Sequence, residues 1–134
     1  MPFSGYARKA MLDWLLGGAA VTRPTSRYLG LSLGTPSSVS GSEGSWSGYT
    51  RQALAFGAAS TVASSGTAIN TAALTFSANA AVTATPVRGY EIWDTNLGTN
   101  SGNMLFYGQL SASSSLVSGD TLSFASGAIV ISLS

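Results

Sequence analysis

The chain has 134 residues, a formal net charge of +1 and neither His nor Cys; 45% of its residues are hydrophobic and only 8% are charged. This length fits one domain spanning residues 1–134, large enough to bury a core without disulfides. Acid–base, thiol and metal chemistry draw on the residue types that are scarce here, so the composition argues against an enzyme and predicts a structural or binding protein with no cofactor.

The basic residues are spread along the chain after an initial pair: Arg8, Lys9, Arg23, Arg27, Arg51 and Arg88. Nucleic-acid binding normally needs a clustered basic stripe, so we expect no nucleic-acid partner. A sparsely charged surface with a net charge near zero favours association. We therefore expect the protein to hide part of its surface in an assembly and to cover the rest with Ser, Thr, Asn and Gly.

The first predicted element is an amphipathic α-helix over residues 5–16, inside an N-terminal arm and helix of residues 1–18. Ser4 is suited to cap its first turn, and Gly17 is suited to end it in the left-handed conformation. Core packing or a subunit contact could cover the apolar face, and both remain open. That face is formed by Ala7, Met11, Trp14 and Leu15, with Leu12 and Leu16 beside them.

The same segment has some features of a signal peptide, because Arg8 and Lys9 precede an apolar run at residues 10–21. However, Asp13 interrupts the run, a Gly-Gly pair breaks it, and it is too short to span a bilayer. We therefore expect a folded helix, no signal peptide and no membrane partner.

Short strands separated by turns follow residue 25. The Ser/Gly-rich segment 35–48 is expected to be an exposed loop, and the polar segment 96–102 is expected to join two strands as a hairpin. About seven strands at this spacing predict an all-β fold, an antiparallel, jelly-roll-like β-sandwich whose open face or edge is covered by the helix. Apolar alternation predicts strands at residues 28–33, 49–56, 68–76, 87–94, 103–110, 121–124 and 128–133.

No group of side chains has a catalytic or metal-binding pattern. Glu91 and Asp94 are close in sequence, but in a strand they point to opposite faces. No His can activate a serine, and Lys9 lies in the helix beside Arg8. The loop at residues 94–103 carries oxygen-bearing side chains that could hold Ca²⁺, but it has only one carboxylate and resembles ordinary turn chemistry. We therefore predict no catalytic residue and no metal ligand.

Two aromatic residues lie in or beside the Ser/Gly-rich segment, Trp46 and Tyr49. An aromatic side chain on a polar loop can stack on a sugar, contact another protein or fold back onto its own domain. Of the two intermolecular roles, we favour a contact with another protein subunit over carbohydrate.

Three motifs occur in order along the chain: GYTR at residues 48–51, GNMLFYG at 102–108 and SGDT at 118–121. With the helix RKAMLDWLLGG and the strand YLGLSLGTP before them, their order resembles a family of small bacteriophage virion structural proteins, often labelled tail-fibre, minor structural or head decoration proteins. The resemblance covers nearly the whole chain. It implies a β-sandwich virion protein without enzymatic activity, made in the host cytoplasm.

Two placements on the particle follow from this resemblance. One is a capsid decoration or cement protein that binds neighbouring major capsid protein subunits, as a homotrimer. The other is a tail-fibre or tail-tip component that contacts the host surface, with a host glycan as a possible ligand. We favour decoration, because the sequence has neither the repeats nor the coiled coil of a fibre shaft. The predicted partner-contact residues are Phe3, Tyr6, Met11, Trp14, Leu15, Trp46 and Tyr49.

Overall fold

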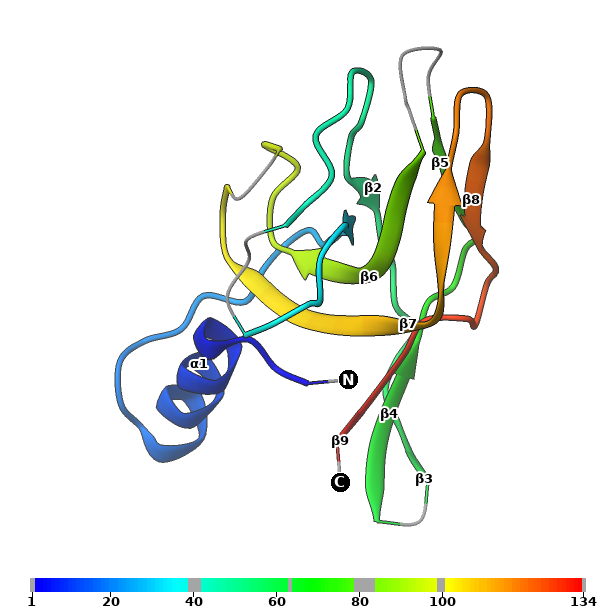
Figure 1. Ribbon diagram of the computed structural model, residues 1–134. Coiled ribbons are helices and arrows are strands. Elements are labelled where there is room, and N and C mark those ends of the chain that lie inside the picture. Colours follow the sequence, from blue (N-terminus) through cyan, green and yellow to red (C-terminus); the bar gives the residue numbers. More distant parts are fainter. Residues whose placement is uncertain (1, 39–41, 63, 79–83, 99–100, 134) are drawn as a thin grey trace.

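Antiparallel strands make up most of the molecule, and one helix stands at its N-terminal end (Figure 1). The computed structural model describes residues 2–38, 42–62, 64–78, 84–98 and 101–133. The helix is α1 (Gly5–Leu16), and the strands are β1 (Tyr28–Ser32), β2 (Gln52–Ala53), β3 (Ser60–Val62), β4 (Ser65–Ile69), β5 (Leu74–Ser77), β6 (Thr85–Trp93), β7 (Met104–Leu116), β8 (Thr121–Phe124) and β9 (Val130–Leu133).

The central sheet has the strand order β2-β1-β6-β7. Strand β1 lies inside it, with Leu29 opposite Gln52 on one side and Ile92 on the other. Leu29 and Leu31 are fully buried. Strands β6 and β7 pair along most of their length, which confirms the predicted hairpin across residues 96–102. This long hairpin forms the curved middle of the molecule in Figure 1.

Two smaller antiparallel sheets complete the β structure, with the orders β3-β4-β9 and β5-β8. The β5-β8 pair supplies aromatic side chains to the core. Phe124 makes edge-on contacts with Phe76 and Tyr90, with ring centroids 6.3 and 6.2 Å apart. The all-β, antiparallel prediction is confirmed, and a β-sandwich is consistent with this arrangement. The jelly-roll-like connectivity stays a prediction.

The prediction of about seven strands is not confirmed, because the described residues form nine. The predicted strand at residues 68–76 is split at Asn70, whose side-chain amide donates to the carbonyl oxygens of Ala72 (2.8 Å) and Ala125 (3.0 Å). Its amide oxygen accepts from the Ile129 N–H at 2.8 Å. These bonds hold the chain in a bend that apolar alternation does not reveal. Of the strand predicted at residues 49–56, only β2 is a strand, and Phe56 forms an isolated bridge with Asn70.

Helix α1 is confirmed with both of its predicted ends. The Ser4 hydroxyl accepts from the Ala7 N–H at 3.0 Å, and Gly17 closes the helix with φ 71° and ψ 29°. No helix in the described ranges is long and apolar enough to cross a membrane.

Candidate partner-contact surface

The N-terminal arm fixes α1 to the central sheet through its first turn. The Ser4 N–H donates to the Leu105 carbonyl at 3.0 Å, and the Tyr107 N–H donates to the Pro2 carbonyl at 3.2 Å. The Ser4 side chain is buried and also donates to the Met104 carbonyl. The arm therefore runs along β7 as an added strand segment, and α1 starts where this pairing ends.

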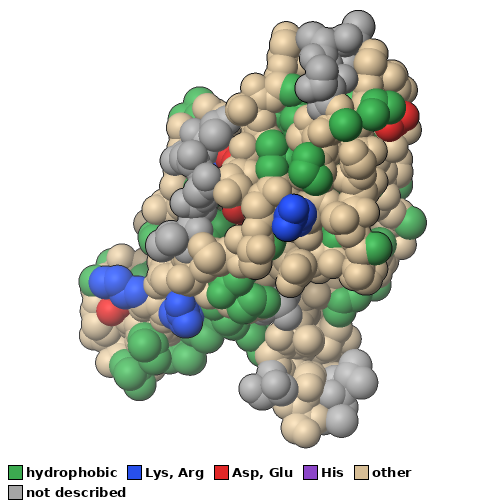
Figure 2. Space-filling model, viewed as in Figure 1, with side chains coloured by type: hydrophobic (Ala, Val, Ile, Leu, Met, Phe, Trp, Pro, Cys, Tyr) green, Lys and Arg blue, Asp and Glu red, His purple; other side chains and the backbone are tan. Residues whose placement is uncertain are grey.

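Beyond this first turn, α1 packs only loosely against the rest of the molecule, and none of its residues is buried. Trp14 is 73% exposed and Leu16 is 79% exposed, and Leu12, Leu15 and Tyr6 are also exposed. Figure 2 shows hydrophobic side chains gathered at the α1 end, next to basic ones. Contiguous exposed apolar surface of this kind is typical of an interaction site.

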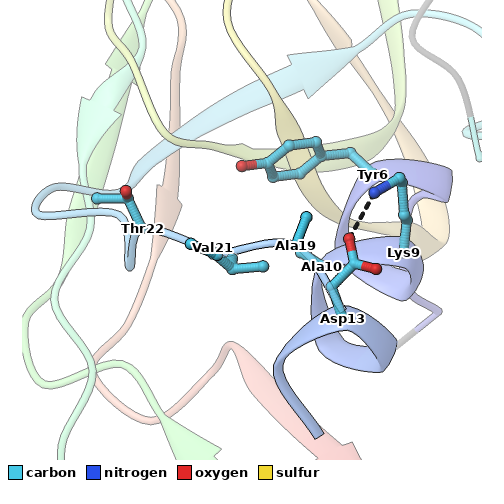
Figure 3. A pocket seen from close by; sticks show the side chains of 8 residues that line it. Tyr6, Lys9, Ala10, Asp13, Ala19, Val21 and Thr22 are labelled. Carbon is cyan, nitrogen blue, oxygen red and sulfur yellow. Dashed lines mark hydrogen bonds and ion pairs between the residues drawn. The ribbon is translucent and has the colours of Figure 1, made fainter. Parts of the chain in front are cut away.

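Two hollows separate α1 from the segment that leads away from it. One has a volume of about 320 Å³ and lies between Tyr6, Lys9 and Asp13 on the helix and residues 19–22 (Figure 3). The Lys9 ammonium donates to the Asp13 carboxylate across one turn at its wall. The other, of about 430 Å³, is an apolar groove lined by Ala10, Met11, Trp14, Val21, Arg23 and Pro24. The helix thus stands off its own return segment and leaves one apolar side unfilled.

The predicted contact residues fall into two groups. Tyr6, Trp14 and Leu15 are exposed on α1, and Met11 is half-buried in the apolar groove. Phe3 is half-buried, because its ring packs on Phe106 with centroids 4.8 Å apart. Trp46 and Tyr49 lie together elsewhere, half-buried and in edge-on contact at 4.8 Å. The seven residues therefore do not form a single surface.

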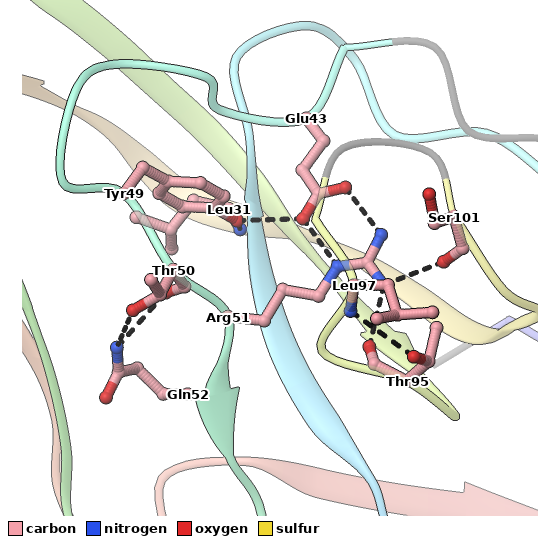
Figure 4. Close-up of polar contacts among 9 residues, drawn as sticks. All are labelled: Leu31, Glu43, Tyr49, Thr50, Arg51, Gln52, Thr95, Leu97 and Ser101. Carbon is pink, nitrogen blue, oxygen red and sulfur yellow. Dashed lines mark hydrogen bonds and ion pairs between the residues drawn. The ribbon is translucent and has the colours of Figure 1, made fainter.

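A buried charged cluster lies behind Trp46 and Tyr49, and sequence reasoning missed it. Arg51 donates two hydrogen bonds of 2.7 Å to the Glu43 carboxylate, one from Nε and one from a terminal nitrogen. Both side chains are fully shielded from solvent. The other terminal nitrogen donates to the carbonyl oxygens of Thr95 (2.7 Å) and Ser101 (2.8 Å), as Figure 4 shows. The guanidinium also lies 4.0 Å from the ring centre of Trp93.

Local backbone pairing brings Glu43 to this position. Residues 42–44 run beside the end of β1, where the Gly44 N–H donates to the Leu31 carbonyl at 2.9 Å. Glu43 and Gly44, inside the segment expected to be exposed, are therefore buried. A Cβ at Gly30 would lie 2.8 Å from a Glu43 oxygen, so β1 can carry no side chain there. The only features of the sequence that point to this cluster are the scarcity of charge and the GYTR motif that contains Arg51.

Tyr49 joins the charged cluster to the sheet. Its hydroxyl donates to Glu43 at 3.0 Å and accepts from the Leu31 N–H at 2.9 Å. Burial, followed by the negative charge of Glu43, raises the pKa of Tyr49 well above its usual range. Tyr49 therefore stays a neutral hydrogen-bonding link at any ordinary pH.

The carboxylate of Asp94 closes the loop after β6. Asp94 accepts from the Asn103 N–H and from its side-chain amide, both at 2.8 Å. No group of three or more His, Cys, Asp or Glu able to hold a metal occurs within the part of the chain that the structure describes. The carboxylate that could bind Ca²⁺ is thus used to brace the hairpin.

Comparison with known proteins identifies a family. Residues 2–132 match the family model described as podophage GP4 fiber I protein gp80. No curated protein matches the chain.

Proposed function

Because the chain belongs to the podophage GP4 fiber I protein gp80 family and is a phage virion structural protein, we propose that it is a fibre subunit that attaches to another virion protein through α1. The single observation that carries the attachment is the exposure of large apolar side chains around α1, with Trp14 73% and Leu16 79% exposed. The fibre placement is supported by the description of the family.

The size of this apolar surface sets the strength of the attachment. Burying an exposed leucine or larger apolar side chain contributes about 1.5–3 kcal/mol. Leu12, Trp14, Leu15 and Leu16 together therefore give a stabilisation comparable to the roughly 4–15 kcal/mol that association costs. One copy would bind modestly, and several copies on one particle would gain avidity without further contacts.

A non-enzymatic role is part of the proposal. The composition supports it, and so does the use of the buried polar groups. Glu43 and Arg51 are bonded to each other and to backbone carbonyls, and Asp94 is bonded to Asn103. These groups hold loops in place, and their hydrogen-bonding capacity is directed at their own chain.

Capsid decoration is the second candidate, with the major capsid protein and further copies of this chain, in a homotrimer, as the partners. It is favoured by the shape of the described residues, whose strands belong to short antiparallel sheets and show no repeated shaft unit. A cement protein would use the same α1 surface to bridge neighbouring capsid subunits.

The test is made on particles of the phage that encodes this protein. Heads and tails are separated, and the copy number in each fraction is measured by quantitative mass spectrometry against the major capsid protein. We expect a small number of copies, in the tail fraction. Hundreds of copies confined to heads would overturn the fibre placement in favour of decoration.

The attachment surface is tested with a matched pair of variants. In Trp14→Gln/Leu16→Gln we expect incorporation to fall at least about tenfold, the equivalent of 1.4 kcal/mol. Leu97→Gln is the control, because Leu97 is 79% exposed like Leu16 but lies in the loop after β6. Equal incorporation of both variants would show that α1 does not carry the attachment.

A further inference from the structure

A small hollow lies between the turn that carries Trp46, the strand β2 and the strand β5. Its volume is about 180 Å³, and its lining includes Trp46, Tyr49, Thr50, Gln52, Thr75 and Ser77. None of its lining residues is charged. It is separate from the α1 surface, because β2 and β5 lie in the upper part of Figure 1 and α1 lies at the lower left.

The aromatic wall of the hollow is held in place before any ligand arrives. The Trp46 ring meets Tyr49 edge-on, and its Nε1–H donates to the Ser77 carbonyl at 3.4 Å. The ring also closes over Gly44, where a Cβ would lie 2.7 Å from the indole. Tyr49 is fixed in turn by the charged cluster. A rigid aromatic surface of this kind binds a ligand at low entropic cost.

The opposite side offers neutral hydrogen-bonding groups. The carbonyl of Ser77 accepts from Trp46, so it lies at the edge of β5 that does not pair with β8. Backbone groups of alternate residues point to the same edge, so the N–H and carbonyl of Thr75 face the hollow as well. The Thr75 hydroxyl lies 3.1 Å from that of Ser123 across the pair, as in a non-hydrogen-bonded position of an antiparallel ladder.

Gln52 supplies an oriented amide at the rim. Its nitrogen donates to the carbonyl and the hydroxyl of Thr50, at 3.1 and 3.2 Å. Figure 4 shows the amide nitrogen turned toward Thr50 and the amide oxygen turned away from it. The oxygen is therefore positioned to accept a hydrogen bond from a ligand hydroxyl.

We propose that this hollow binds one ring of a neutral saccharide. A pyranose has an apolar C–H face, which matches the aromatic wall, and a rim of hydroxyls that both donate and accept, which matches Gln52 and the edge of β5. The absence of charge in the lining disfavours sialic or uronic acids. The inference rests on the proposed function, since a site far from α1 remains accessible on an attached fibre subunit and can face the host surface.

The test follows the indole N–H signals of the ¹⁵N-labelled full chain during titration with methyl glycosides of glucose, galactose, mannose, rhamnose and N-acetylglucosamine. The chain has three tryptophans, and Trp46→Phe assigns the signal of interest. We expect at least one glycoside to move the Trp46 signal saturably, with a Kd of about 1 mM. The signals of Trp14 and Trp93 should stay in place.

Gln52→Ala and Gln109→Ala provide the matched comparison, since Gln109 is an exposed glutamine on β7 outside the hollow. We expect Gln52→Ala to weaken binding about tenfold, as loss of one hydrogen-bonding group to a ligand does, and Gln109→Ala to leave it unchanged. The proposal is overturned if no glycoside moves the Trp46 signal up to about 50 mM, if the Trp14 signal moves instead, or if both variants bind alike. None of these results would alter incorporation into virions, so failure here is distinguishable from failure of the proposed function.

Discussion

The charged cluster and the helix α1 reverse the usual distribution of polar and apolar side chains. Glu43 and Arg51 have no exposed side-chain surface, whereas Trp14 and Leu16 are exposed over most of theirs. The cluster is complete within one chain, because every bond drawn from Arg51 ends on an acceptor of the same molecule. The α1 surface is incomplete in one chain. The comparison separates what holds the fold from what is left for a partner.

The cluster can exist inside the fold because its charges are matched closely. A buried ion pair gains stability over its desolvation cost only when geometry is good and the remaining polar atoms are bonded. Arg51 meets Glu43 in the two-bond geometry that suits a carboxylate, and two carbonyl groups satisfy its other terminal nitrogen. The cluster thereby joins three segments, namely residues 42–44, the start of β2 and the loop after β6.

The largest effect is expected from breaking this pair. Arg51→Met leaves the Glu43 carboxylate buried without its partner, which should cost about 3–5 kcal/mol of unfolding free energy. Urea denaturation of the isolated protein measures the loss. Arg88→Met is the matched control, because Arg88 is exposed on β6 and its substitution should change stability by less than about 0.5 kcal/mol.

A double variant identifies the source of that loss. If the cost comes from the unpaired charge, Glu43→Met/Arg51→Met should recover at least half of it, since apolar replacement of a whole buried pair is often neutral. A loss below about 1 kcal/mol in Arg51→Met would mean that the pair does not hold the three segments together.

The same contrast explains which parts of the structure could be predicted from the sequence. Helix α1 was predictable with both ends, because Ser4 and Gly17 act within one turn of it. Strand β8 was predicted with its observed bounds, since its alternation is unbroken and turn residues flank it. The split at Asn70 was not predictable, because its side chain bonds to Ala125 and Ile129, more than fifty residues away.

For the contact surface, the sequence identified the apolar side of α1 but could not decide what covers it. Periodicity reports which side is apolar and not whether the chain returns to bury it. The cluster was missed for a related reason. Glu43 lies in a Ser/Gly-rich stretch typical of exposed loops. It packs against Gly30, and its partner Arg51 contacts Trp93 and the loop after β6; only the tertiary fold brings these parts together.

The second prediction uses the neutral link between cluster and sheet. Burial and Glu43 raise the pKa of Tyr49 in the folded protein above the 10.0 of an exposed tyrosine. Below pH 10 the hydroxyl is protonated in both states, so its contribution to stability is fully present there. Above pH 10 only the unfolded state loses the proton, and stability should fall by about 1.4 kcal/mol per pH unit for each such tyrosine.

Tyr49→Phe isolates this contribution. The pKa of Tyr90 is also raised by burial, so the variant should keep part of the alkaline slope and lose the part due to Tyr49. Denaturation in urea at several pH values between about 9 and 11.5 measures the slope. Identical slopes for Tyr49→Phe and the unmodified protein would contradict the assignment.

The smallest effect on stability is expected from the α1 double variant, although its expected effect on assembly is large. Trp14→Gln/Leu16→Gln removes apolar surface that the isolated fold does not bury, and Gln matches Leu closely in helix propensity. The unfolding free energy should therefore change by no more than about 0.5 kcal/mol, whereas Leu29→Ala in the fully buried centre of the sheet should cost about 2–5 kcal/mol. Urea denaturation of the two variants side by side makes the comparison.

A loss above about 1 kcal/mol in the α1 variant would mean that α1 stabilises its own chain. A stable variant that fails to enter virions would instead assign the exposed apolar side chains of α1 to a partner, because folding and attachment would then depend on different residues.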